Sequence, residues 1–223
     1  MHTKHVLAIL AIGLFCLTGV HAQSNNQTTV AIEIVYDGSG SMGDSVPGLN
    51  GESTPKFVIA SNAIVNIANQ IHTFVKTKHA QVEAGLVPFY GGEVRAGLPL
   101  RKFNQMAFIL WAQNIPSPDG GTPLGRAIKE ASSQLSKSSA SKKFILIVTD
   151  GESNAGPEPA TVLSEIKNTQ PVVKSFFVAF DVNADVFSGA KTQGATVVSA
   201  ANATELTTQI NNLLGQKILL EAE

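Results

Sequence analysis

Apolar runs of strand length recur along the chain and alternate with segments of helical periodicity. The first run, VAIEIVYD at 30–37, is apolar at both parities except at Glu33. This pattern is typical of a strand covered on both faces of a parallel sheet. We expect Glu33 to lie near the start of the strand, where water can reach it. The same reasoning predicts strands at 80–89, 93–100, 143–150, 173–181 and 195–200, with 80–89 and 93–100 forming a hairpin across YGG.

Between these strands, apolar residues recur at spacings of three and four, which places them on one face of a helix. The clearest stripe runs from Phe57 to Phe74, and another places Leu124 and Leu135 on one face. Further helices are predicted at 105–115, 159–168, 184–192 and 203–220. Residues 42–56 and 116–125 are rich in glycine, proline and serine, and we predict loops there.

Alternating strands and helices predict one α/β domain over 30–220. We expect a doubly wound, Rossmann-like fold with a mostly parallel, six-stranded sheet, one antiparallel edge strand and helices on both faces. In such sheets ligands bind beyond the carboxyl ends of the strands.

The first 22 residues are predicted to be a signal peptide rather than part of the fold. A short basic start precedes the apolar run VLAILAIGLFCLTGV, and small side chains precede Gln23, so we predict cleavage after Ala22. The apolar run is shorter than the roughly 20 residues that a membrane span needs. Residues 23–29 read as a disordered lead-in. The mature chain is therefore expected to be secreted or periplasmic, without a membrane span.

Composition narrows the class of partner. The 223 residues carry a formal net charge of −1, which gives no electrostatic reason for binding nucleic acid or acidic lipid. Cys16, the only cysteine, lies in the predicted signal peptide. An exported domain without disulfides has to rely on core packing, bound ions or both.

Oxygen-bearing side chains follow three of the predicted elements. Asp37, Ser39 and Ser41 lie in DGSGS after the first strand, Thr122 lies in GGTPLG, and Asp150 ends the strand at 143–150. We expect the alternate side chains of DGSGS to point the same way from an extended loop. Carboxylate and hydroxyl oxygens suit Mg²⁺, and also Mn²⁺ or Ca²⁺, rather than zinc or copper.

Only two of these five side chains carry charge. An ion bound by them would stay electrophilic and keep a position open, so a carboxylate from another molecule would be a favourable last ligand. The residues therefore indicate a metal that joins the domain to a protein with an exposed Asp or Glu.

The order DGSGS, GGTPLG, TDG resembles the metal-ion-dependent adhesion site of von Willebrand factor type A domains, known in integrins as I domains. The resemblance covers the chain from Val30 to about Leu220. It implies that Ser39, Ser41 and Thr122 are direct ligands, and that Asp37 and Asp150 bind directly or through water. It also implies metal-dependent protein binding in adhesion or complex assembly, without catalysis.

Three alternatives stay open. The long segment after Ser41 carries Asp44 and Glu52, either of which could mask the metal, and the domain would then be an envelope assembly or scaffold factor. GDSV at 43–46 is similar to the nucleophile block of GDSL hydrolases, with Ser45 as nucleophile, but the late histidine of that family is missing. Asp181 and Asp185 could hold a second ion, although Asp185 fits better as the residue that opens a helix.

Overall fold

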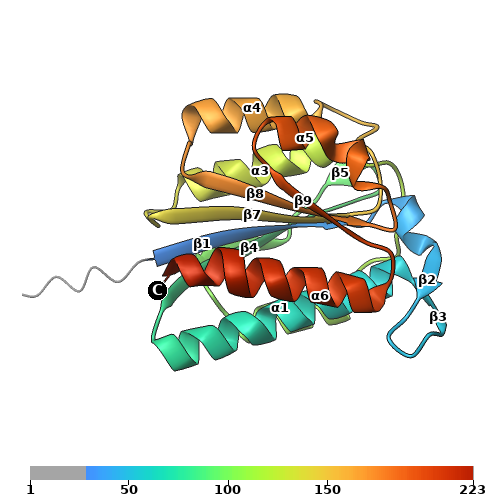
Figure 1. Cartoon of the computed structure of the whole chain (residues 1–223), viewed down its shortest axis with the longest axis horizontal. Helices are drawn as coiled ribbons and strands as arrows, with labels where there is room; N and C mark the ends of the chain where they lie inside the picture. The colour runs from blue at the N-terminus through green and yellow to red at the C-terminus, as the bar shows by residue number, and fades with distance from the viewer. Residues whose placement is uncertain (1–28, 223) are drawn as a thin grey trace, which may run out of the picture.

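The computed structural model describes residues 29–222 and contains a central, twisted, mostly parallel sheet (Figure 1). Its strand order is β5-β4-β1-β7-β8-β9, and β6 also pairs with β4. Strands β5 and β6 are antiparallel to β4, whereas the other pairings are parallel. The strands are β1 (Thr29–Asp37), β4 (Gln81–Tyr90), β5 (Glu93–Val94), β6 (Leu98–Lys102), β7 (Lys142–Thr149), β8 (Val173–Phe180) and β9 (Thr196–Ala200).

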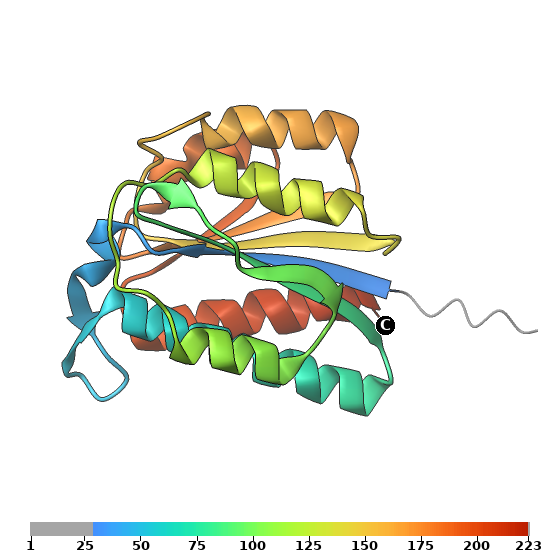
Figure 2. The same ribbon diagram turned by 180° about the vertical axis from the view of Figure 1, so that it is seen from behind.

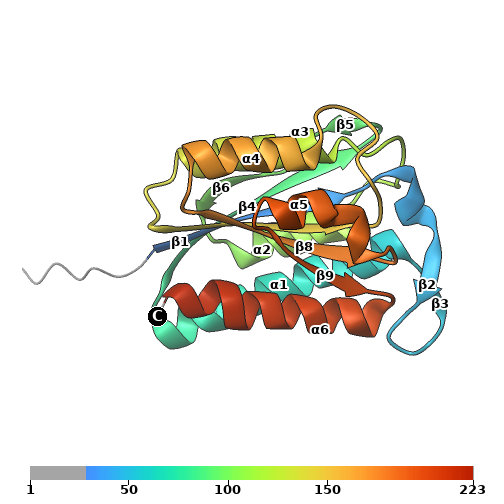
Figure 3. The same ribbon diagram turned by 45° about the horizontal axis from the view of Figure 1, so that its top comes forward.

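Helices cover both faces of the sheet (Figures 1 and 2). One layer contains α1 (Lys56–Lys78), α2 (Gln105–Gln113) and α6 (Ala203–Leu213). The other contains α3 (Leu124–Ser136), α4 (Pro159–Thr169) and α5 (Ser188–Thr192), which Figure 3 shows over the sheet. The predicted doubly wound α/β fold with an antiparallel edge is confirmed.

The side chains of β1 alternate between the two layers. Ile32, Ile34 and Tyr36 pack on the α1 side, and Ala31 and Val35 pack on the α3 side. Trp111 of α2 meets Tyr36 edge-on, with 5.2 Å between ring centroids. Both faces of β1 are therefore buried, as the unbroken apolar run predicted.

The sheet has seven strands rather than the predicted six, because the antiparallel edge is split into β5 and β6. A Cβ at Gly97, between them, would lie 2.0 Å from the carbonyl oxygen of Leu86. Only glycine allows this close approach of the two backbones, so the break falls there.

Two other segments also differ from expectation. The predicted loop at 42–56 begins within a 3₁₀ turn, η1 (Gly40–Gly43), and contains a small hairpin of β2 (Ser45–Pro47) and β3 (Ser53–Pro55). The last helix is not uniform: α6 is followed by a π-helical segment, η3 (Leu214–Ile218), and a 3₁₀ turn, η4 (Leu219–Ala222). The predicted helix at 184–192 begins as a 3₁₀ turn, η2 (Ala184–Phe187), and continues as α5.

The expectation that water reaches Glu33 is wrong. Its exposed fraction is 0%, and its two carboxylate oxygens have no hydrogen-bond partner among the described residues. Glu33 lies at mid-strand between Gly85 of β4 and Ile145 of β7, in a sheet covered on both faces. A Cβ at Gly85 would come within 2.3 Å of Oε1, so this glycine makes the space that the carboxyl group occupies.

None of the helices within residues 29–222 is long and apolar enough to cross a membrane. The predicted signal peptide and most of the predicted lead-in lie outside the described residues, apart from Thr29, which begins β1.

Candidate metal centre

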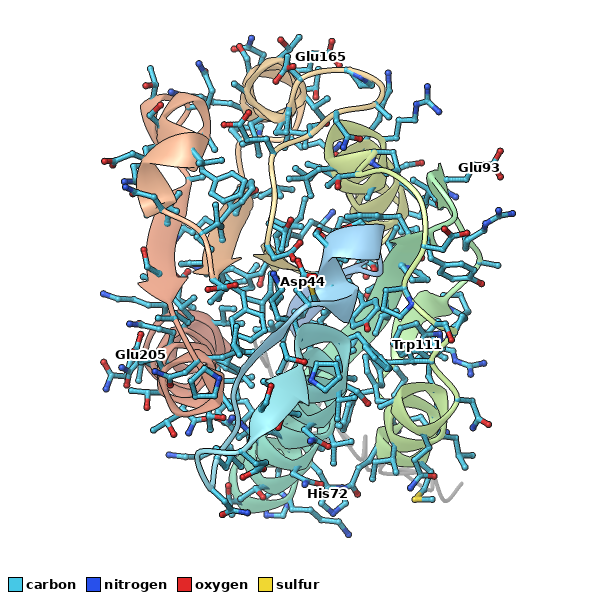
Figure 4. All side chains as sticks on the ribbon, turned by 90° about the vertical axis from the view of Figure 1, so that its right-hand side faces the viewer. Asp44, His72, Glu93, Trp111, Glu165 and Glu205 are labelled. Atoms are coloured by element: carbon cyan, nitrogen blue, oxygen red, sulfur yellow. The ribbon has the colours of Figure 1, made fainter. Side chains whose placement is uncertain are left out.

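The carboxyl ends of the parallel strands lie on one face of the molecule, and Figure 4 looks onto this face, with Asp44 near its middle. Asp37 ends β1 and is 1% exposed. Its Oδ1 accepts hydrogen bonds from the Ser39 hydroxyl at 2.6 Å and the Ser39 N–H at 2.8 Å. The hydroxyls of Ser39 and Ser41 lie 3.2 Å apart.

The expected extended loop is therefore wrong in its geometry. Ser39 precedes the 3₁₀ turn Gly40–Gly43, and this turn brings the two serine hydroxyls together. Ser39 is buried, whereas Ser41 is exposed, so the group opens to solvent on the Ser41 side.

Asp37 is held from a second direction by a residue that sequence reasoning missed. The hydroxyl of Thr149, the last residue of β7, donates to Asp37 Oδ2 at 2.6 Å. Burial first, and then the neighbouring Asp150, raise the pKa of Asp37 to about 6, while the hydrogen bonds from Ser39 and Thr149 act in the opposite direction. A polar residue at the end of an otherwise apolar strand was the available sequence signal.

The loop that carries Thr122 is bound to the DGSGS loop through the backbone. Gly40 N–H donates to the Gly120 carbonyl at 2.9 Å, and Asp119 N–H donates to the Gly38 carbonyl at 3.0 Å. Gly120 has a φ of +76°, and a Cβ there would lie 2.2 Å from the nitrogen of Gly92. This position therefore requires glycine for its conformation and for the close contact.

Thr122 itself is fixed by Asn154 from the loop after β7. Asn154 Oδ1 accepts from the Thr122 N–H at 2.7 Å, and Asn154 N–H donates to the Thr122 carbonyl at 3.1 Å. Thr122 as a whole residue is 4% exposed, and no hydrogen bond joins its hydroxyl to another described residue. The hydroxyl oxygen is not among the fully buried unpartnered atoms of the described residues, so a ligand from outside the chain can reach it.

Asp150 joins the group from the end of β7. Its Oδ1 accepts from the Ser41 hydroxyl at 2.8 Å, across 109 residues of sequence. Its Oδ2 forms an ion pair, rather than an aligned hydrogen bond, with Lys56 Nζ at 2.8 Å. The Lys56 ammonium also lies 3.3 Å from Oδ2 of Asp181, just beyond β8.

Lys56 is the second residue that sequence reasoning missed. It is 4% exposed, and burial lowers its pKa, but its contacts with Asp150 and Asp181 outweigh burial and raise the pKa above the ordinary value. It looked like one more polar residue in a loop, and only the fold shows that it lies beside Asp150.

The structure thus joins four of the five predicted ligands in one hydrogen-bonded group and binds the loop of the fifth, Thr122, against the first loop. Within residues 29–222 no three His, Cys, Asp or Glu side chains form a ligand cluster. A cation at this place would therefore depend on hydroxyls together with the two carboxylates. Such an all-oxygen donor set fits Mg²⁺, Mn²⁺ or Ca²⁺.

The side chains of the other candidate residues form no direct hydrogen bond with this group, although Asp44 and Asp181 lie near Lys56. Asp44 and Glu52 are exposed, and neither side chain hydrogen bonds to any of the five. Ser45 begins β2, is exposed and makes no side-chain hydrogen bond within the described residues. Asp185 lies in the first turn of η2 and forms an ion pair with Lys191, whereas Asp181 forms an ion pair with Lys56.

Comparison with known families decides the class of the domain. The profile of the von Willebrand factor type A domain matches residues 32–212. The chain belongs to the von Willebrand factor type A domain family. The matched region contains most of β1, the other strands of the sheet, all three loops of the candidate metal centre and most of α6.

Solved structures with this vWA fold include pilus proteins of low sequence identity. The PilB minor pilin of Streptococcus sanguinis is 16% identical with a TM-score of 0.69, over 87% of this chain and 62% of PilB. The pilus adhesin SpaC of Lactobacillus rhamnosus GG, in its open conformation, is 15% identical with a TM-score of 0.69, over 88% of this chain and 30% of SpaC.

The vWF domain of the type V pili tip protein Mfa5 from Porphyromonas gingivalis is 12% identical with a TM-score of 0.65, over 88% of this chain and 97% of that domain. A search of curated proteins returned no match. The chain thus spans less than two thirds of PilB and SpaC, and the likeness concerns the fold.

Proposed function

We propose that this vWA domain binds a divalent cation, Mg²⁺ in the first instance, through Asp37, Ser39, Ser41, Thr122 and Asp150. The bound ion would join the domain to a protein partner, whose Asp or Glu carboxylate completes the coordination. The function is then adhesion or complex assembly outside the cytoplasm, without catalysis.

The observation that carries the proposal is the continuous chain of contacts from Asp37 through Ser39 and Ser41 to Asp150. It links the carboxyl ends of two neighbouring strands, the place where doubly wound sheets bind ligands. The unpartnered hydroxyl of Thr122 comes from a loop that is hydrogen-bonded to the first. Chance placement of polar residues would not combine these features.

Each side chain has a distinct part in this proposal. The three hydroxyls are neutral oxygen donors, so they would bind the cation without cancelling its charge. Asp37 holds the Ser39 hydroxyl and Asp150 holds the Ser41 hydroxyl, so the carboxylates orient the donors and supply negative charge. The bound cation supplies Lewis acidity and a coordination position for an external carboxylate.

The solvent access of the candidate metal centre and the descriptions of structurally similar proteins support the choice of a protein partner. The group opens to solvent at Ser41, beside the protruding hairpin β2–β3, whose tip carries the 64% exposed Leu49. The structurally similar chains are described as a minor pilin, a pilus adhesin and a pilus tip protein. Export agrees with the signal peptide predicted from residues 1–22.

The test uses Thr122→Val, which exchanges a hydroxyl without a protein partner for a methyl group of similar size. Mg²⁺ at 100 times its Kd should stabilise the wild type by about 2.7 kcal/mol, which is roughly 5–10 °C in Tm for a domain of this size. The variant should lose this increase while keeping its Tm in chelator. Asp185→Ala removes an exposed carboxylate that pairs with Lys191 and is not one of the proposed ligands. It is the matched control, and its Tm should respond to Mg²⁺ like that of the wild type.

Equal Mg²⁺ responses of the wild type and Thr122→Val would overturn the metal site. For the partner, binding to the wild type in Mg²⁺ should disappear in chelator and in Thr122→Val. A partner that is retained under all these conditions would favour the alternative, a scaffold whose metal is structural or masked.

A further inference from the structure

Lys56 is a cation in an unfavourable place. It is the first residue of the 23-residue helix α1, where the positive end of the helix dipole repels an ammonium group. It is also 4% exposed, and burying a charge costs free energy unless the charge is paired. A lysine at this position therefore needs strong compensation from its neighbours.

Three carboxylates provide the compensation to different extents. Lys56 Nζ lies 2.8 Å from Asp150, 3.3 Å from Asp181 and 4.0 Å from Asp44. The Asp150 side chain is 0% exposed, whereas those of Asp181 and Asp44 are 41% and 75% exposed. Water screens the last two, so Asp150 is the dominant partner.

The backbone holds Lys56 in this position. Its N–H donates to the Asp44 carbonyl at 2.8 Å, and the Asp44 N–H donates to the Ser41 carbonyl at 3.0 Å. The preceding Pro55 has its φ restricted by the ring and lies at −58°. The ammonium is thus attached, through two backbone hydrogen bonds, to the loop that carries the serine hydroxyls.

We propose that Lys56 is a tethered cation that sets the charge of the metal centre, so that the centre binds a bare divalent ion weakly and an ion together with an anionic ligand strongly. This inference rests on the proposed function. Asp44 and Asp181 are screened by water, and among the remaining groups Asp37, Asp150 and a divalent ion have formal charges that sum to zero. Lys56 adds one positive charge, and an incoming carboxylate removes it.

Two consequences follow for the binding equilibria. Repulsion between the ammonium and the ion opposes metal binding in the absence of a ligand. A carboxylate that joins the ion relieves this repulsion, so metal and ligand each strengthen the binding of the other. Lys56 would therefore determine specificity for acidic partners without touching them.

The experiment compares the wild type with Lys56→Met, which keeps an unbranched apolar stem and removes the charge. Lys56→Arg keeps the charge at the same place. Lys174→Met removes an exposed lysine from its ion pair with Glu221, at the opposite end of the strands, as the matched control. Mg²⁺ is titrated by calorimetry in chloride and in acetate at equal ionic strength, and unfolding is followed with Mg²⁺ and with chelator.

Lys56→Met should bind Mg²⁺ in chloride about tenfold or more tightly than the wild type, because even in water the repulsion of a divalent ion by a nearby unit charge is worth at least this factor. Acetate should strengthen Mg²⁺ binding to the wild type and to Lys56→Arg, and clearly less to Lys56→Met. Lys174→Met should match the wild type in both salts.

Other outcomes separate this inference from the metal site itself. If Lys56→Met binds Mg²⁺ no more tightly than the wild type, the proposed role of Lys56 is overturned while the metal site stands, and Lys56 merely positions Asp150. Mg²⁺ binding by Lys56→Met only would support the inference. Binding by neither protein would overturn the metal site as well.

Whether Lys56→Met folds with Mg²⁺ and with chelator also tests the role of Lys56. If Lys56→Met folds in Mg²⁺ but not in chelator, the ion replaces the lost charge, as the inference requires. Failure to fold under both conditions would contradict it, since Lys56 would then serve the fold rather than the charge of the centre.

Discussion

Replacing Glu33 by Gln should change how the stability of the domain depends on pH. Burial, and then the nearby Glu130, raise the pKa of Glu33 from 4.5 to about 9. In the unfolded chain the group ionises near its ordinary value, so between these two pKa values the folded state holds a proton that the unfolded state releases. Stability therefore falls as pH rises through this window and levels off above the folded pKa.

The size of this loss of stability follows from the free energy of 1.36 kcal/mol that corresponds to each pKa unit. From pH 4.5 to pH 7 the window spans about 2.5 units, so the wild type should lose roughly 3 kcal/mol through Glu33. Gln fills the same space beside Gly85 but does not ionise, so the variant should lack this contribution. Its stability relative to the wild type should rise steadily from pH 5 to pH 8.5.

Urea unfolding in chelator, at half-unit steps of pH, measures this difference directly. All other ionisable groups are common to the two proteins and largely cancel in the difference between them. Parallel stability profiles across the whole range would refute the reasoning, because Glu33 would then ionise in the folded protein as it does in the unfolded one.

Two further substitutions test how the candidate centre is built. Gly120→Ala should be destabilised by about 1–3 kcal/mol more than Gly51→Ala and should lose the Mg²⁺ response in thermal melts, since both positions have positive φ but only Gly120 has backbone within 3 Å of the new Cβ; equal losses would contradict the crowding argument. Thr149→Val removes the 2.6 Å hydrogen bond to Asp37 and should weaken Mg²⁺ binding roughly tenfold to hundredfold in a calorimetric titration; unchanged affinity would show that Asp37 needs no support from β7.

The sequence predicted the layers of this fold well because burial on both faces leaves an unmistakable pattern. The run ending at Asp37 became β1, and the run before Asp150 became β7. Parallel strands bring their carboxyl ends together, so pairing Asp37, Ser39 and Ser41 with Asp150 required only the order of the elements. The contact between Ser41 and Asp150 follows from that topology.

Features that depend on tertiary packing were not predictable in the same way. Glu33 violates the apolar pattern, and its burial depends on the space that Gly85 leaves on a neighbouring strand. Lys56 lies in a segment without periodicity, and its position depends on the hairpin that brings it beside Asp150. Strand register and local hairpins decide both cases, and periodicity carries no information about either.

The central claim is that a divalent cation binds among the hydroxyls of Ser39, Ser41 and Thr122. Crystals grown with Mn²⁺ allow the ion to be located by its anomalous scattering. We predict a single strong peak about 2.0–2.6 Å from these three hydroxyl oxygens, and its absence in crystals of Thr122→Val. A Mn²⁺ peak elsewhere in the domain, or none at this place at saturating Mn²⁺, would contradict the proposed centre.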